Sequence, residues 1–168
     1  MSRPEPPRIY RRIVAVCRPL MRAMTSPRRW RGSEHLPDGP FVVVANHISV
    51  FDPFTLLHFL VDHDVYPSVL VKASLWRYPV IGSLLTRVGA VPVHRGSADA
   101  SGALVAAQTA LSQGFAVMLY PEGTTTLDPQ EWPMRAKTGA ARLALLTGAP
   151  VIPVALWGAQ RVIPSRGR

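Results

Sequence analysis

Short apolar runs alternate with longer segments of helical periodicity along most of the chain. Five runs predict strands, because each is short, rich in valine and bounded by turn-forming or polar residues; they are 41–46, 68–72, 91–94, 115–120 and 151–156. The segments between them predict helices at 53–62, 74–87, 98–113 and 134–147, the second of which Pro79 interrupts. This alternation predicts a single α/β domain with a largely parallel central sheet flanked by helices.

The first 31 residues follow another pattern. On a helical wheel of residues 8–24, apolar side chains take one side and five arginines the other; the apolar set is Ile9, Ile13, Val16, Leu20 and Met24, flanked by Tyr10 and Cys17, and the basic set is Arg8, Arg11, Arg12, Arg18 and Arg22. A basic amphipathic helix of this kind is expected to lie in the interface of an anionic membrane. Because Pro19 disfavours a straight helix, a kinked pair of short helices is an alternative.

The charge of the chain is concentrated in this segment. The formal net charge is +9, and nine of the 19 basic residues are arginines within the first 31 positions, opposed there by Glu5 alone. Each basic residue close to an anionic membrane contributes about 1 kcal/mol. Two other interpretations stay open: a helix packed on its own domain with solvated arginines, and an arm that neutralises nucleic-acid phosphates. The sequence shows no pattern of a helix-turn-helix or RNA-binding module, so we expect no specific nucleic-acid partner.

Length and composition limit the organisation. A chain of 168 residues suits one domain, and a hydrophobic content of 48% excludes general disorder. Cys17 is the only cysteine, which excludes an internal disulfide and a cysteine-rich metal site. The sequence contains no uninterrupted run of 18 apolar residues and no secretory signal pattern. We expect residues 1–33 to associate peripherally with the cytoplasmic face of the cell membrane and residues 34–168 to form the folded domain.

Polar residues follow the carboxyl ends of four predicted strands. His47 and Asp52 follow the first, Lys72 ends the second, Arg95 follows the third, and Pro121-Glu122-Gly123-Thr124 follows the fourth. Since ligands of open α/β sheets bind beyond the carboxyl ends of the strands, we expect these groups to meet at one rim. A histidine oriented by a carboxylate is a general base, so the rim is typical of a group-transfer site.

Four ordered blocks of this chain resemble the glycerolipid acyltransferase family, which includes lysophosphatidic acid acyltransferases. The blocks are His47…Asp52, Gly89-Ala90-Val91-Pro92-Val93-His94-Arg95, Tyr120-Pro121-Glu122-Gly123-Thr124 and Val151-Ile152-Pro153-Val154. Between them, Lys72, Pro79, Gly82, Lys137 and Gly139 also match the family's usual positions. The resemblance covers about residues 34–160.

The resemblance implies transfer of a fatty acyl group from acyl-CoA or acyl carrier protein to the hydroxyl of a lysophospholipid, with lysophosphatidic acid the expected acceptor and phosphatidic acid the product. His47 is then the general base and Asp52 its orienting carboxylate. The implied acceptor and phosphate contacts are Arg95, Glu122, Gly123, Thr124 and Lys72. The family requires no metal and no cofactor beyond the thioester donor.

Two departures from the family pattern bear on function. Thr125 stands where the third block usually has an arginine, which casts doubt on a plain lysophosphatidic acid acceptor and leaves other lysolipids open. Family members usually continue well past the final block, so we expect residues 34–168 to be a C-terminally shortened acyltransferase domain. The alternative function is that of a catalytically degenerate member that binds lipid or CoA at the membrane surface.

Overall fold

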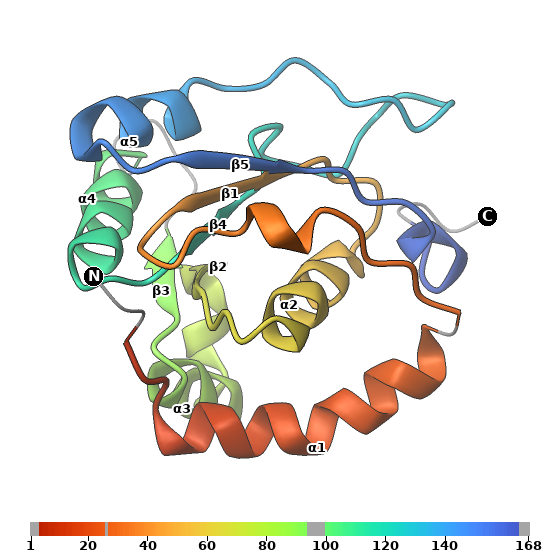
Figure 1. Cartoon of the computed structure of the whole chain (residues 1–168), viewed down its shortest axis with the longest axis horizontal. Coiled ribbons are helices and arrows are strands. Elements are labelled where there is room, and N and C mark those ends of the chain that lie inside the picture. The colour runs from red at the N-terminus through yellow and green to blue at the C-terminus, as the bar shows by residue number, and fades with distance from the viewer. Residues whose placement is uncertain (1–3, 26, 94–99, 165–168) are drawn as a thin grey trace.

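The computed structural model describes residues 4–25, 27–93 and 100–164 (Figure 1). Its strands are β1 (Val42–Ala45), β2 (Ser68–Lys72), β3 (Val91–Val93), β4 (Val117–Leu119) and β5 (Val151–Val154). Its α-helices are α1 (Arg8–Met24), α2 (Asp52–Asp62), α3 (Pro79–Arg87), α4 (Ala100–Ser112) and α5 (Gly139–Thr147). The strands form one sheet in the order β3-β2-β4-β1-β5, and every pairing is parallel. The prediction of a single α/β domain with a parallel sheet is therefore confirmed.

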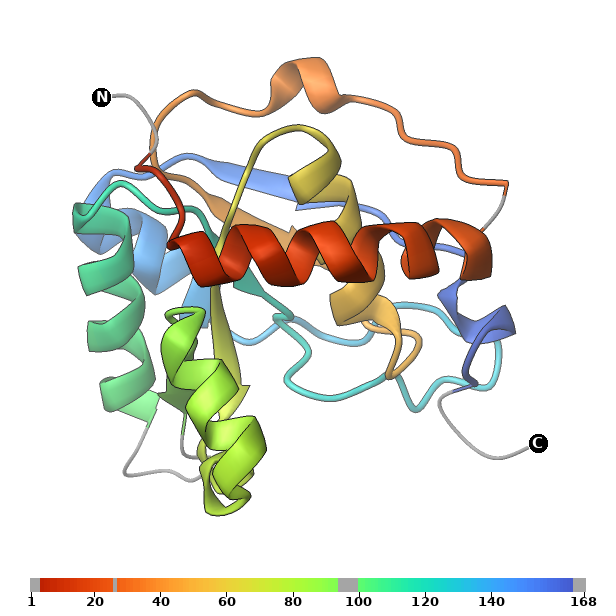
Figure 2. The same cartoon turned by 90° about the horizontal axis from the view of Figure 1, so that it is seen from below.

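The sheet is covered by helices on both faces, and β1 contributes to both cores. Val43 and Ala45 belong to a cluster with Leu56, Phe59 and Leu60 of α2. Val42 points to the other side, into a cluster built from α4 and α5 that includes Ala107, Leu111 and Leu143. In Figures 1 and 2, α2 lies between the sheet and α1, while α4 and α5 lie together at the other side. A strand buried on both faces explains why β1 is apolar at every position.

The helix boundaries differ from the prediction in two places. The segment 74–87 is divided: a short 3-10 helix, η2 (Ala73–Arg77), ends before Pro79, which starts α3 because proline suits the first turn of a helix. The predicted helix 134–147 begins only at Gly139. Residues 134–138 do not continue it, because the main-chain N–H groups of Met134 and Lys137 bind Glu122 Oε2 and the Pro121 carbonyl, at 2.8 Å each.

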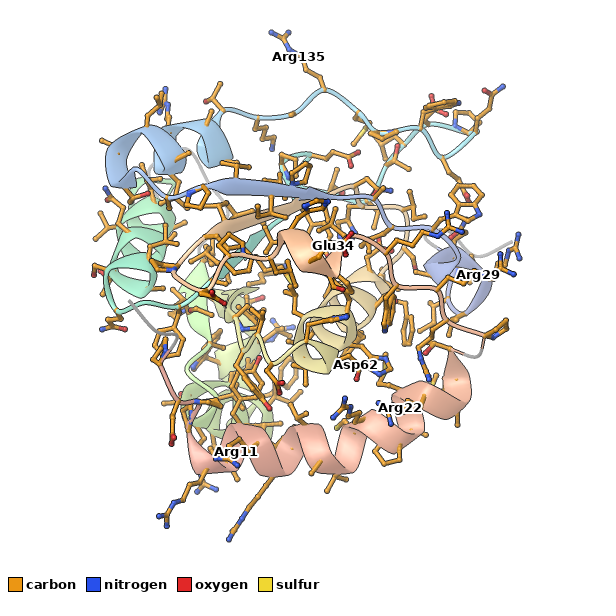
Figure 3. The ribbon with its side chains drawn as sticks, in the orientation of Figure 1. Arg11, Arg22, Arg29, Glu34, Asp62 and Arg135 are labelled. Atoms are coloured by element: carbon orange, nitrogen blue, oxygen red, sulfur yellow. The ribbon has the colours of Figure 1, made fainter. Side chains whose placement is uncertain are left out.

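Helix α1 is continuous through Pro19, so the predicted alternative of two short helices is wrong. Two contacts hold it on the domain. At its start the buried Tyr10 donates a 3.4 Å hydrogen bond to the Pro67 carbonyl and meets Tyr66 edge-on. Nearer its end, Arg18 and Arg22 reach Asp62, the last residue of α2, at 2.6 and 3.4 Å (Figure 3).

The arginine side of α1 therefore faces the domain at its carboxyl-terminal half. Its apolar side is turned outward there, with Val16, Leu20 and Met24 exposed by 77%, 62% and 46%. The interpretation of a helix packed on its own domain with solvated arginines is therefore wrong about Arg18 and Arg22, which pair with Asp62. Among the described residues, no helix is both long and apolar enough to cross a bilayer.

Candidate active site

His47 and Asp52 are in direct contact in the loop that joins β1 to α2. His47 Nδ1 lies 2.9 Å from Asp52 Oδ2, and the same oxygen accepts hydrogen bonds from the main-chain N–H groups of Ile48 and Ser49 at 2.6 and 2.7 Å. Asp52 is fully buried and is the first residue of α2, where the helix dipole stabilises a negative charge. The carboxylate thus fixes both the loop and the imidazole.

This contact determines which nitrogen of His47 can act as a base. An ionised carboxylate only accepts hydrogen bonds, so Nδ1 carries the proton and the lone pair is on Nε2. The His47 side chain is 16% exposed, which leaves its edge open to a ligand. The Tyr120 ring stacks on the imidazole at 4.3 Å between centroids and 27° between planes. The ring is therefore held in position by Asp52 at one edge and Tyr120 on one face.

Glu122 connects the His47 loop to the segment that precedes α5. Its Oε1 accepts a hydrogen bond from the main-chain N–H of His47 at 2.9 Å, and its Oε2 accepts one from Met134 N–H at 2.8 Å. The side chain is only 4% exposed. In a second contact His47 is the acceptor, because Thr126 N–H donates to the His47 carbonyl at 2.7 Å. The turn after β4 thus encloses the His47 main chain.

The hydroxyl of Tyr120 is a buried polar group with no hydrogen-bond partner among the described residues, and the same is true of Asp52 Oδ1. Burial raises the pKa of the Tyr120 hydroxyl, and the negative charge of Asp52 raises it further. Both effects favour the neutral phenol. Its neutral ring is well suited to pack against His47 without competing for the proton.

The remaining predicted site residues differ in how closely they approach His47. Gly123, with φ of 76°, lies in the turn after β4, followed by the exposed Thr124. Lys72 ends β2 on the same edge of the sheet, two strands from β1, and its side chain is exposed. Arg95 lies outside the described residues. The structure brings His47, Asp52, Glu122 and Gly123 together and leaves Lys72 at the rim.

Two contacts at the site were not predicted from the sequence. Asn46 pairs with Leu156 through both its amide atoms, at 3.0 and 2.7 Å, and so joins the ends of β1 and β5. The side chain of Lys137 lies against Gly123. Lys137 matches the family pattern, but that pattern does not indicate which residue its side chain contacts. Within the described residues, no group of three His, Cys, Asp or Glu side chains could hold a metal ion.

Comparison with known proteins gives one consistent result. The profile of the Acyltransferase family matches residues 28–157. A chloroplastic 1-acyl-sn-glycerol-3-phosphate acyltransferase of Brassica napus is 33% identical over 80% of this chain and 38% of its own length. The enzyme of the same name from Borreliella burgdorferi is 31% identical over 75% of this chain and 49% of its own. The crystal structure of the 1-acyl-sn-glycerophosphate (LPA) acyltransferase PlsC from Thermotoga maritima has a TM-score of 0.65 and 31% identity, over 82% of this chain and 53% of that one. The chain thus spans between 38% and 53% of the length of these relatives.

Proposed function

Because this chain belongs to the acyltransferase family, we propose that it transfers a fatty acyl group from an acyl thioester to the hydroxyl of lysophosphatidic acid. The observation that carries the proposal is the 2.9 Å contact of His47 Nδ1 with the fully buried Asp52 carboxylate, which directs Nε2 of the imidazole away from Asp52 and toward a ligand. The 1-acyl-sn-glycerol-3-phosphate acyltransferases that the chain matches support this acceptor.

The reaction begins with a proton transfer to His47. A lipid hydroxyl is a weak nucleophile, so Nε2 removes its proton as the oxygen attacks the thioester carbonyl; a positioned base of this kind contributes about 10²–10⁴-fold. The new C–O bond gives a tetrahedral intermediate, which collapses as the C–S bond breaks. The departing thiolate then takes the proton from Nε2. Asp52 stabilises the imidazolium between these two steps and keeps the proton on Nδ1.

The donor is acyl-CoA or acyl carrier protein, and no metal or further cofactor takes part in the proposed reaction. Both donors are acidic, and the net charge of +9 favours their approach. Arg95, Lys72 and the main chain of the Glu122-Gly123-Thr124 turn are the proposed acceptor contacts. The turn is the part of this set that bonds the His47 main chain, through the 2.9 Å contact of Glu122 Oε1.

Measurement of thiol release from acyl-CoA tests this function. We expect release when lysophosphatidic acid is supplied, and expect His47→Ala to abolish it while the thermal unfolding midpoint stays close to that of the unmodified chain. A mutant with equal turnover would contradict the assignment of His47 as the base. If the folded wild-type chain binds acyl-CoA or lysolipid without releasing thiol, the alternative of a degenerate lipid-binding member is supported instead.

The same chain is proposed to work on the cytoplasmic face of a membrane, held peripherally by α1. The lysolipid acceptor is itself a membrane component, so the enzyme must reach the interface. Arg18 and Arg22 are drawn to Asp62 on the domain side, which leaves Val16 and Leu20 outermost. Exposed arginines elsewhere in the segment supply attraction to anionic headgroups; they are Arg8, Arg11, Arg12, Arg29 and Arg31.

A further inference from the structure

The side chain of Lys137 lies directly over the main chain of Gly123. A Cβ atom at Gly123 would stand 2.8 Å from Lys137 Nζ and 3.3 Å from its Cε. A side chain at this position would displace the Lys137 ammonium, and the φ of 76° at Gly123 is a conformation that favours glycine. The ammonium group is therefore located in the turn that follows β4.

Main-chain hydrogen bonds fix that location. Lys137 N–H donates to the Pro121 carbonyl, and Met134 N–H donates to Glu122 Oε2, at 2.8 Å each. Glu122 Oε1 in turn accepts from His47 N–H at 2.9 Å. Lys137 and His47 are thus attached to the same two-residue turn. Both residues therefore contact the turn that follows β4, one through the His47 main chain and the other through the Lys137 main chain and ammonium.

Among the residues that the structure describes, the positive charge of Lys137 has no acidic partner. None of the ion pairs formed by the described residues involves it, and both oxygens of the nearby Glu122 carboxylate already accept main-chain N–H groups. The side chain is exposed, so its three N–H donors are open to solvent. An exposed cation without an ion pair, on the turn that also binds the His47 main chain, is suited to an anionic substrate.

We propose that Lys137 binds the phosphate of the lysolipid acceptor and so sets the preference for a phosphate-bearing lysolipid. This inference rests on the proposed acyltransferase function. Thr125, two residues after Gly123, is uncharged. Lys137, whose side chain lies against Gly123, provides a positive charge at the same turn. An ammonium acts on phosphate as a point charge, so Lys137 requires no strict geometry of its ligand.

The test compares a charged acceptor with a neutral one. Lysophosphatidic acid and the monoacylglycerol with the same acyl chain are supplied in mixed micelles to the wild-type chain, to Lys137→Gln and to Lys137→Arg. We expect Lys137→Gln to raise KM for lysophosphatidic acid by about tenfold to a hundredfold, the effect of losing one charged hydrogen bond. KM for monoacylglycerol and kcat for both acceptors should not change, and Lys137→Arg should remain close to wild type.

Arg135 provides the matched control. It is a second exposed cation of the same segment and projects away from the domain (Figure 3). Arg135→Gln should leave both KM values unchanged. An equal rise in KM for both acceptors, or a fall in kcat alone, would overturn the proposal in favour of a structural role. A rise in KM for acyl-CoA with none for lysophosphatidic acid would assign Lys137 to the donor's phosphates and would also overturn it.

A binding measurement separates this inference from the proposed function. Glycerol 3-phosphate is titrated into the ¹⁵N-labelled chain, and the amide resonance of Gly123 is followed. A shift in the wild-type chain that is lost in Lys137→Gln supports the phosphate site even if no turnover is found. Identical titrations of the two proteins would overturn it even if the enzyme is active.

Discussion

Oε1 of Glu122 accepts a 2.9 Å hydrogen bond from the main-chain N–H of His47, although 75 residues separate them. The second oxygen of the carboxylate binds Met134 N–H. Glu122 therefore holds the loop between β1 and α2 through the main chain of His47, while Asp52 holds the imidazole. This arrangement favours a positioning role for Glu122 over direct contact with the acceptor.

The substitution Glu122→Gln should affect kcat more than KM. A glutamine carbonyl can replace one acceptor, but its NH₂ group then faces the other N–H, and a buried unsatisfied donor destabilises a fold by about 1–3 kcal/mol. We expect urea unfolding to show a loss of this size. A small shift of the His47 loop should lower kcat by about 10²-fold. A rise in KM for the acceptor with unchanged kcat would contradict the positioning role and support acceptor binding.

The substitution Asp52→Asn should abolish most activity without removing the base. An amide can donate to Nδ1, which would move the proton of His47 to Nε2 and leave no lone pair for the acceptor hydroxyl. We expect kcat to fall by about 10³-fold or more, with a lower free energy of unfolding because Ile48 and Ser49 N–H lose a charged acceptor. Thiol-release kinetics and urea unfolding measure the two effects. Near-normal kcat would refute Asp52 as the orienting group.

The sheet could be predicted from the sequence nearly to the residue. Strand 68–72 has the predicted ends, 41–46 loses one residue at each end and 151–156 loses its last two, while 115–120 is shortened to Val117–Leu119. Parallel strands that are buried by helices are continuous apolar runs, so they can be recognised from a short stretch of sequence. The start of α5 at Gly139 was not predictable in the same way, because the residues before it bind the turn at Pro121 and Glu122, which is distant in sequence.

The proximity of His47, Asp52 and Glu122 could be predicted from the sequence, but their contacts could not. The rule that ligands bind beyond the strand ends placed His47, Asp52 and Glu122 on one edge. It could not show that both oxygens of Glu122 are used by main-chain N–H groups, or that Lys137 lies on Gly123, since neither contact has a periodic signal. The orientation of α1 could not be predicted from the sequence either, because it depends on the contact with Asp62, the last residue of α2.

Removal of the Tyr120 hydroxyl should be tolerated. The group is buried without a partner among the described residues, so Tyr120→Phe removes an unsatisfied polar atom and keeps the stack on His47. We expect the free energy of unfolding to stay the same or to rise by up to about 1 kcal/mol, with kcat close to wild type. Differential scanning calorimetry and thiol release provide the measurements. A large fall in kcat would mean that the hydroxyl contacts the reacting atoms.

His58 should make the fold less stable in mild acid. Its side chain is buried in α2, with Nε2 3.5 Å from Asp62 Oδ2. Burial lowers the pKa of His58 below its ordinary 6.5; the Asp62 carboxylate opposes this shift, and Arg28, Arg22 and Arg18 add to it. Below pH 6.5 the unfolded chain therefore binds a proton that the folded chain does not, so the free energy of unfolding should decrease as the pH falls from about 6.5.

The variant His58→Gln tests this origin, because glutamine does not titrate. Burial acts to raise the pKa of Asp62, but hydrogen bonds from Trp30 and Arg18 outweigh this effect and hold that pKa below 3.8. Asp62 therefore stays ionised between pH 5 and 6.5. The stability that it contributes is lost only below this range. Urea unfolding at several pH values should show a flatter profile for His58→Gln. His35→Gln, at an exposed histidine, is the control and should keep the wild-type slope. An unchanged slope in His58→Gln would refute the assignment.

The outward side of α1 should carry membrane binding. In the double variant Val16→Ser, Leu20→Ser two exposed apolar side chains are removed from the helix while Arg18 and Arg22 keep their contacts with Asp62. Burial of each such side chain contributes about 1.5–3 kcal/mol, so partitioning onto vesicles should fall by at least about tenfold. Flotation with vesicles that contain anionic lipid measures this, and added salt should weaken binding by wild-type protein because it screens the arginines.

A control on the opposite layer distinguishes this surface from general hydrophobicity. Leu145 and Leu146 of α5 are exposed by 87% and 61%, so the double variant Leu145→Ser, Leu146→Ser removes a comparable apolar area. It should float like the wild-type chain if α1 forms the contact. Equal losses in both double variants would show that binding does not depend on α1. Retained flotation of the α1 variant, with loss in the α5 variant, would instead place the membrane against α5 and contradict the orientation set by Asp62.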